Sequence, residues 1–395
     1  MVKRRLAVVL LLLLTGGVLL TRAHGEDSGS TITAQVEGRQ SPSRRDLDPF
    51  TLQEIMQKYR VPGVSVAVIS GFKVHWAKGY GVADVETDRP VDVDTRFQAA
   101  SVSKPVTTMA VLKAAQDNRL SLDADVNTIL KSWKVPHSDL TTTPVTPRAL
   151  LSHTSGAGDG FGFPGYHPSQ ARPTLVQILK GDKPSNVGSV FFERPPFTAF
   201  KYSGGGFLIM QLALMETLGR PFAEILRESV LDPLNMANST YEQPLPGVLE
   251  SKAARAHNRE GKAMDAKWHV YPEQAAAGLW TTPTDLAAFV VEIQRALGGP
   301  AGRILSQAMA KEMVAPVGIG PYGLGLVLNK RGEGWYFSHR GGNWGFHCAL
   351  LGHVRRGYGV AVMTNGENGT PVINEVEARV AAVYRWDSLD KPIPR

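Results

Sequence analysis

Cysteine is nearly absent from this sequence. Cys348 is the single cysteine among 395 residues, so no disulfide can form within the chain. The core must therefore be held together by the burial of apolar side chains alone. Cys348 precedes the apolar run Ala349–Leu351, and we interpret it as a small core residue rather than a reactive thiol.

Patterns for binding metals, phosphates and nucleic acids are also missing. The ten histidines are dispersed and show neither His-x-x-x-His nor Cys/His ligand spacing, so we expect no metal. Gly204–Gly206 is not followed by Lys-Ser or Lys-Thr, which excludes a phosphate-binding loop. Residues 1–25 contain four basic residues and no acid, so they contribute four units of the formal net charge of +7, and no basic run alternates with aromatics. We therefore expect no cofactor and no nucleic-acid partner.

The N-terminal residues have the pattern of a targeting segment. Lys3-Arg4-Arg5 is followed by an apolar run from Leu6 to Leu14 that resumes at Val18, with small residues near Ala23. This predicts a signal peptide over residues 1–25 and an exported protein, periplasmic or secreted. An uncleaved anchor is the alternative, and membrane contact would then be made by this segment only. Residues 26–47 are polar and are predicted to be a flexible leader.

The rest of the chain predicts an α+β fold. Strand-like runs at 63–69 and 73–80 are separated by a tight turn, and further short runs follow at 322–328, 335–338, 347–351 and 359–363. Between about 97 and 297 the chain reads as helices with long Pro/Gly-rich loops. We predict one domain over 48–386, with an antiparallel sheet flanked by terminal helices and a mainly helical lobe over about 97–297. Residues 387–395 would be a tail.

Ser101 and Lys104 are the first candidate catalytic pair. Residues three apart in a helix share a face, so both side chains should point into the same space. A serine needs a group that takes its proton, and burial favours the neutral amine that can do so. The Ser-x-x-Lys pattern also occurs at 70–73, in a predicted turn, and at 388–391, in the polar tail. Only the match at Ser101 opens an apolar helix.

Two further stretches carry candidate site residues. Tyr202 stands beside Gly204–Gly206 and is either a buried aromatic at a tight turn or a phenol near the Ser–Lys pair that acts as general base. Residues 338–346 are either a strand that ends in a Gly-rich turn, with His339 packed or solvated, or an edge strand that lines a pocket. In the second case the N–H groups of Gly342 and Ser101 could form an oxyanion hole.

In order and spacing, these motifs resemble the serine hydrolase superfamily that includes class C β-lactamases, D-alanyl-D-alanine carboxypeptidases, D-aminopeptidases and related esterases. The supporting stretches are Leu150–Gly156, Ala277–Leu286, Tyr322–Gly325 and Gly342–Phe346. The resemblance runs from about residue 48 to 384 and implies a β-lactamase/transpeptidase-like fold.

The resemblance also implies roles for particular residues. Ser101 would be the acylated nucleophile, Lys104 its proton relay, and Tyr202 the general base and later the acid. The stretch His339-Arg340-Gly341 would hold the substrate, and the N–H groups of Ser101 and Gly342 would bind the oxyanion. His153 looks like a structural member of its loop.

Two departures from the family pattern bear on the substrate. Gly204 stands where the family often has an asparagine that helps to bind an acylamino side chain, and His339 stands where β-lactamases have a lysine for the substrate carboxylate. Neutral imidazole is a poorer carboxylate partner, although Arg340 would compensate if it faces the pocket. Pocket walls are expected from loops such as residues 160–166.

We therefore predict an exported serine hydrolase that acts through an acyl-enzyme on an ester or amide, of the carboxylesterase or D-amino-acid peptidase type. Its substrate would be a small molecule or a peptide, cell-wall peptides included. The alternatives are a β-lactamase proper and a non-catalytic protein that binds peptidoglycan peptides.

Overall fold

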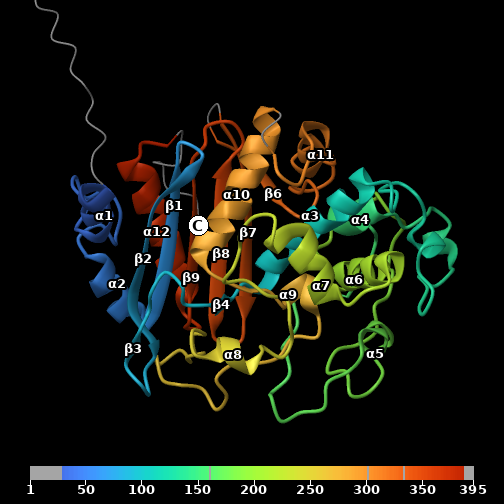
Figure 1. Ribbon diagram of the computed structural model, residues 1–395, viewed down its shortest axis with the longest axis horizontal. Helices are drawn as coiled ribbons and strands as arrows, with labels where there is room; N and C mark the ends of the chain where they lie inside the picture. The colour runs from blue at the N-terminus through green and yellow to red at the C-terminus, as the bar shows by residue number, and fades with distance from the viewer. Residues whose placement is uncertain (1–28, 160–161, 300–301, 332–333, 387–395) are drawn as a thin grey trace, which may run out of the picture.

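An antiparallel sheet runs through the middle of the molecule (Figure 1). The computed structural model describes residues 29–159, 162–299, 302–331 and 334–386, and within them the sheet has seven strands in the order β3-β2-β1-β9-β8-β7-β6. Their bounds are β1 (Gly63–Ser70), β2 (Lys73–Asp84), β3 (Arg89–Pro90), β6 (Val327–Arg331), β7 (Gly334–Asn343), β8 (Phe346–His353) and β9 (Gly359–Thr364). The predicted antiparallel sheet is confirmed, although the run at 322–328 becomes a strand only from Val327.

Both faces of the sheet are covered by helices, which explains why its central strands are almost entirely apolar. In β1 the side chains of Val64, Val66 and Val68 belong to the core on one face, and those of Ala67 and Ile69 to the core on the other. The first face packs against α1 (Gly29–Glu37), α2 (Leu52–Tyr59) and α12 (Gly369–Val383), and the second against α10 (Pro283–Gly298). The helical lobe therefore ends before α10, not at about residue 297 as predicted.

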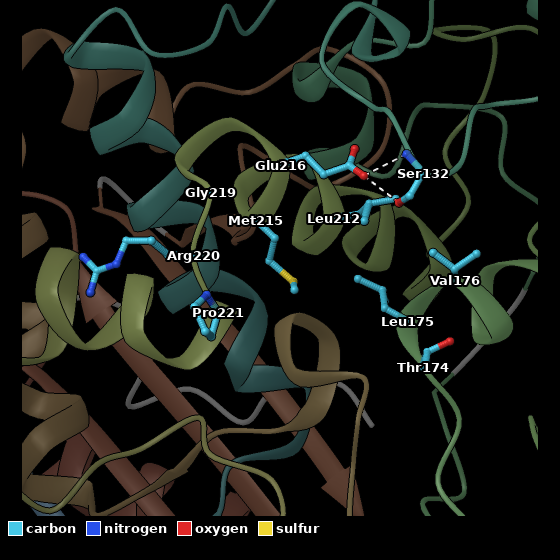
Figure 2. Close-up of a pocket in the computed structure, with 10 residues that line it drawn as sticks. All are labelled: Ser132, Thr174, Leu175, Val176, Leu212, Met215, Glu216, Gly219, Arg220 and Pro221. Atoms are coloured by element: carbon cyan, nitrogen blue, oxygen red, sulfur yellow. Dashed lines mark hydrogen bonds between the residues drawn. The ribbon is translucent and has the colours of Figure 1, made fainter.

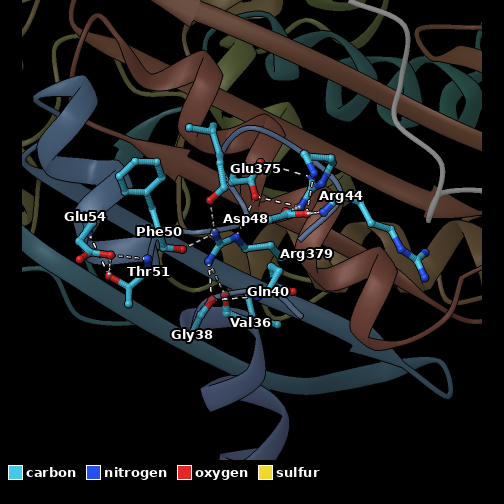
Figure 3. A network of polar contacts seen from close by, with 12 residues as sticks. Val36, Gly38, Gln40, Arg44, Asp48, Phe50, Thr51, Glu54, Glu375 and Arg379 are labelled. Atoms are coloured by element: carbon cyan, nitrogen blue, oxygen red, sulfur yellow. Dashed lines mark hydrogen bonds and ion pairs between the residues drawn. The ribbon is translucent and has the colours of Figure 1, made fainter. Parts of the chain in front are cut away.

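The N-terminal segment is part of this packing. Residues 29–37 form α1, in which Val36 is fully buried, and α1 contacts α12. The guanidinium of Arg379 on α12 donates hydrogen bonds to four backbone carbonyls of this segment and of the turn after it (Figure 3), those of Val36, Gly38, Leu47 and Phe50. The prediction of a flexible leader over 26–47 is therefore wrong from residue 29 onward. The predicted signal peptide 1–25 and tail 387–395 lie outside the described residues.

Replacing Arg379 with methionine is expected to destabilise the fold by about 3–5 kcal/mol, because it breaks a fully buried ion pair and leaves carbonyl acceptors without a donor. Arg379 also pairs with Glu375 at 2.9 Å. Chemical denaturation measures the effect. The matched control is Arg39→Met, which removes an exposed pair with Glu54 and should leave the unfolding free energy nearly unchanged. Equal effects of the two substitutions would contradict the anchoring role of Arg379.

The helical lobe is built around α3 (Ser103–Gln116), which is buried on almost every side. Its neighbours are α6 (Gly204–Leu218), α7 (Phe222–Leu226) and α9 (Gln274–Ala277), and the outer part holds α4 (Pro147–Leu151) and α5 (Leu175–Lys180). α8 (Gly247–Glu250) lies at the bottom of the molecule in Figure 1, apart from α4 and α5. α11 (Gln307–Met313) packs on α10 and α3. A short ladder of β4 (Phe97–Gln98) and β5 (Trp280–Thr281) precedes η1 (Ala100–Val102), a single turn that contacts β7 and leads into α3. The site described below lies at this junction of sheet and lobe.

The described helices include none that is both long and apolar enough to span a lipid bilayer.

Candidate active site

Ser101 lies in the η1 turn that precedes α3 rather than in the helix itself. Ala100 before it has a φ of +50°, a left-handed conformation that is uncommon outside glycine and that marks a sharp change of chain direction. Ser101 is only half-buried, and its Oγ accepts a hydrogen bond of 3.0 Å from the Nζ of Lys104. The structure thus brings the predicted Ser–Lys pair together.

Lys104 is fully buried and its amine is surrounded on several sides. Besides Ser101, the Nζ donates to the carbonyl oxygen of Ala276 in α9 at 2.9 Å. It lies 5.0 Å from the ring centroid of Tyr202 and 5.7 Å from that of Phe207. The two oxygens and the two aromatic faces hold the amine in place beside the serine hydroxyl.

Tyr202 is positioned by the start of α6. The next residue, Ser203, is the N-cap: its Oγ accepts from the N–H of Gly206 at 2.9 Å and donates to a carboxyl oxygen of Asp159 at 2.5 Å. The Tyr202 ring stacks on the imidazole of His153, with centroids 4.3 Å apart. The structure therefore brings Tyr202 to the Ser–Lys pair, as the second interpretation of its motif predicts.

His153 keeps a defined tautomer behind the tyrosine. Its Nδ1 accepts a hydrogen bond of 3.1 Å from the N–H of Ser203, so the ring proton of the neutral imidazole is on Nε2. Burial, with a smaller contribution from the charge of Lys104, holds the pKa of His153 well below its usual value. A neutral ring can stack on Tyr202 without adding a second cation beside Lys104.

Strand β7 forms the opposite side of the site. β6 pairs only with Gly334–Ser338, so among the described residues no strand covers the edge of β7 from His339 to Asn343. The η1 turn packs there, and a Cβ on Gly341 would lie 2.4 Å from the carbonyl oxygen of Ala99 and 2.7 Å from the nitrogen of Ser101. Only glycine permits this approach, which brings the backbone of β7 at Gly341 against Ser101.

Asn343 fixes the end of this strand. Its Nδ2 donates to the side-chain oxygen of Gln98 at 3.0 Å and to the carbonyl of Ala277 at 3.1 Å. Sequence reasoning missed this role, as it missed that of Asp159 at the start of α6. A signal for Asn343 existed, because it lies two residues after Gly341 and so shares its face of the strand. Asp159 lies in an irregular loop and had none.

His339 and Arg340 lie on opposite faces of β7. His339 is buried, its Nδ1 lies 2.8 Å from the carbonyl oxygen of Arg340, and its ring centroid is 6.2 Å from that of Tyr202. Burial, with the nearby charge of Lys104, lowers the pKa of His339 to about 3, so the imidazole is neutral. The Arg340 side chain instead pairs with Glu377 of α12. The expectation that Arg340 holds the substrate is therefore wrong.

A comparison with known families identifies the family of this chain. The profile described as Beta-lactamase matches residues 51–384, which is most of the chain. The chain belongs to the β-lactamase family. Ser101, Lys104 and Tyr202 lie inside the matched region.

Individual relatives of this member of the β-lactamase family are distant. Protein flp of Staphylococcus aureus is 24% identical over 336 residues, which are 82% of this chain and 63% of flp, so the chain spans less than two thirds of that relative. Among solved structures, the octameric penicillin-binding protein homologue from Pyrococcus abyssi has a TM-score of 0.71 at 22% identity, over 87% of this chain and 78% of that one. The D-amino acid amidase from Ochrobactrum anthropi SV3 has a TM-score of 0.69 at 22% identity, over 90% and 98%. These likenesses confirm the predicted fold.

A buried carboxyl group lies just before α9, the helix that contacts Lys104. Glu273 precedes α9, whose Ala276 carbonyl accepts from Lys104. It is fully buried, and in the part of the chain that the structure describes neither of its carboxyl oxygens has a hydrogen-bond partner on another residue. Burial raises the pKa of Glu273 from 4.5 to about 8.

This carboxyl group should make stability depend on pH. Between about pH 4.5 and 8 the folded state keeps a proton on Glu273 that the unfolded state has lost, so the unfolding free energy falls as pH rises. Glu273→Gln should therefore be more stable than the wild type at pH 8.5, by an amount on the order of a few kcal/mol, and similar to it near pH 4.5. Thermal unfolding at both pH values measures this, and an equal difference at the two would contradict it.

A hollow of about 460 Å³ lies elsewhere, on the outer side of the helical lobe (Figure 2). It is lined by Ser132, Thr174, Leu175, Val176, Leu212, Met215, Glu216, Gly219, Arg220 and Pro221. Its serine is engaged, because the hydroxyl and N–H of Ser132 both donate to Glu216. Arg220 pairs with Glu224 and Glu228. None of the lining residues belongs to the predicted catalytic set.

Proposed function

We propose that the protein hydrolyses esters or amides through an acyl-enzyme on Ser101. The observation that carries this proposal is the 3.0 Å hydrogen bond from the buried Nζ of Lys104 to the half-buried Oγ of Ser101. A hydroxyl held against a buried amine and open to the surface is the arrangement of an activated nucleophile.

In the proposed reaction, Ser101 Oγ attacks the substrate carbonyl carbon while its proton passes through Lys104 to Tyr202. The N–H groups of Ser101 and Gly342 stabilise the oxyanion of the tetrahedral intermediate. Its collapse breaks the bond to the alcohol or amine, which takes the proton from Tyr202 as it leaves. Water then attacks the acyl-enzyme with Tyr202 as base, and the proton returns to Ser101 Oγ.

For the substrate, we propose a carboxylesterase or D-amino-acid peptidase type of activity rather than that of a β-lactamase. The residues of β7 on the Ser101 side are His339, Gly341 and Asn343, and none of these three carries a positive charge at neutral pH. The cation of the strand, Arg340, is paired with Glu377 on the other face. A substrate with a carboxylate beside the leaving group would gain little from this strand, whereas an uncharged ester or amide fits it.

We also propose that the mature protein is exported, on the signal-like pattern of residues 3–23. Cleavage near residue 25 would leave α1 intact, because this helix begins at Gly29. N-terminal sequencing of the protein recovered from the periplasm or the medium tests this, and an unprocessed chain confined to the cytoplasm would overturn it.

The test of the catalytic proposal is labelling with a fluorophosphonate, followed by intact-mass measurement and peptide mapping. One adduct on the peptide that contains Ser101, together with turnover of p-nitrophenyl acetate, is the expected result. Turnover of penicillins in place of esters would instead favour a β-lactamase. The absence of both labelling and ester turnover would overturn the proposal in favour of a non-catalytic binding protein.

A further inference from the structure

The ring of Phe163 packs against Gly204 at the start of α6. A Cβ on Gly204 would lie 2.7 Å from the Cε2 and 2.9 Å from the Cζ of the Phe163 ring. Gly204 is the first residue of α6 and lies two residues after Tyr202. The edge of the Phe163 ring therefore occupies the space that any side chain at position 204 would need, directly beside the proposed general base.

Asp159 and Tyr166, on either side of Phe163 in the sequence, are hydrogen-bonded to other parts of the fold, and the Phe163 ring forms a wall beside Gly204. On one side, Asp159 accepts from the N–H of Gly205 at 2.7 Å and from the hydroxyl of Ser203. On the other side, the N–H of Tyr166 donates to the carbonyl of Val270 at 2.8 Å. Both contacts are to elements that themselves border the site.

The same wall continues to the end of β7. The carbonyl oxygen of Pro164, next to Phe163, lies 2.9 Å from the Nδ1 of His269. The His269 ring stacks on the indole of Trp344, with centroids 4.0 Å apart and an interplanar angle of 5°. Trp344 follows Asn343, the last residue of β7. Phe163 at the start of α6 and the stacked pair of His269 and Trp344 at the end of β7 are thus joined through Pro164, and we call these three side chains the rim.

We infer that this rim, through Phe163, selects acyl groups that are apolar next to the scissile carbonyl and disfavours those with an amide there. The inference rests on the proposed function and names its substrate class. A ring edge offers an amide N–H or C=O no hydrogen-bond partner, and an amide buried without a partner loses binding free energy. An alkyl group in the same place gains from burial against the ring.

The test compares two p-nitrophenyl esters of nearly equal shape. N-acetylglycinate has an amide in its acyl chain, and 4-methylpentanoate replaces that amide with CH(CH3)-CH2. The readout is the ratio of kcat/KM for the two esters in each variant, divided by the ratio in the wild type, so that the different chemical reactivities of the esters cancel.

Phe163→Ala is expected to shift the ratio at least about tenfold toward N-acetylglycinate, because the apolar contact is lost and water can reach the amide. Gly204→Asn combined with Phe163→Ala should shift it further, since the new side-chain amide has room and can pair with the substrate. Phe163→Leu keeps an apolar wall and should stay close to the wild type.

Phe72→Ala is the matched control. It truncates a half-buried phenylalanine at the turn between β1 and β2, at the opposite end of the strands from Ser101, and should leave the ratio unchanged.

The outcomes separate the two claims. Hydrolysis of both esters with the ratio unchanged in Phe163→Ala and in the double variant would overturn the inference and leave the proposed function standing. Failure of the wild type to hydrolyse either ester or to take the fluorophosphonate label would overturn the proposed function, and the inference with it. A thermal unfolding curve of each variant shows that the ratios come from folded protein.

Discussion

Ser101→Ala is expected to lower kcat for ester hydrolysis by at least about 10⁴-fold, because the residue that forms the covalent intermediate is removed. The fold should survive the change. Ser101 is half-buried and its hydroxyl accepts a hydrogen bond from Lys104, whose Nζ keeps the carbonyl of Ala276 as an acceptor when the hydroxyl is removed. Steady-state kinetics with p-nitrophenyl acetate and a thermal unfolding curve together measure both effects.

The chain supplies its own control for this experiment. Ser70 also stands three residues before a lysine, but at the end of β1, next to the turn that leads into β2. Ser70→Ala should keep the wild-type kcat. Retention of turnover in Ser101→Ala would contradict the assignment of the nucleophile, and a failure of this variant to fold would show that the residue is structural.

Lys104→Met is expected to lower kcat by about 10³-fold or more, because a serine hydroxyl without an adjacent proton relay is a weak nucleophile. Methionine has a similar length and fits an environment that already includes the rings of Tyr202 and Phe207. The substitution destabilises the fold because the Ala276 carbonyl loses its donor. It also removes a buried amine, which offsets part of this loss. The variant should therefore fold, and its rate of fluorophosphonate labelling should fall together with kcat.

Lys113→Met provides the comparison on the same helix, since Lys113 makes a partly exposed pair with Asp117 at the end of α3. It should leave kcat and labelling unchanged. If Lys104→Met were labelled as fast as the wild type, activation of Ser101 by Lys104 would be refuted, whatever the effect on turnover.

The features that were predicted correctly from the sequence are those specified by the pattern of neighbouring residues. The strands of the sheet are short apolar runs bounded by turns, and Ser101 and Lys104 are three residues apart at the start of a buried helix, so neighbouring residues alone specify them. The side of β7 to which Arg340 points was also predictable. Successive residues of a strand face opposite sides of the sheet. Because Gly341 faces Ser101, the Arg340 side chain must point to the other face.

Other features depend on contacts that no local pattern reveals. The segment before α2 is polar and reads as flexible, but it is ordered by Arg379, which is more than three hundred residues later in the chain. Asp159 and Phe163 contact α6 from outside it, and Gly204 and Gly205 leave the space that their side chains occupy. Glycines beside a tyrosine indicated a close approach, and the approaching residues became clear only from the structure.

The order of the strands has a consequence for how the chain folds. β1 pairs on one side with its hairpin neighbour β2 and on the other with β9, and Ala67 and its partner Ala361 are about 300 residues apart in the chain. The centre of the sheet therefore cannot close until nearly the whole chain has been synthesised. Until then the apolar β1 exposes an unpaired edge, on which another chain could add a strand. A chain that ends before Gly359 should accordingly aggregate rather than fold into a smaller hydrolase.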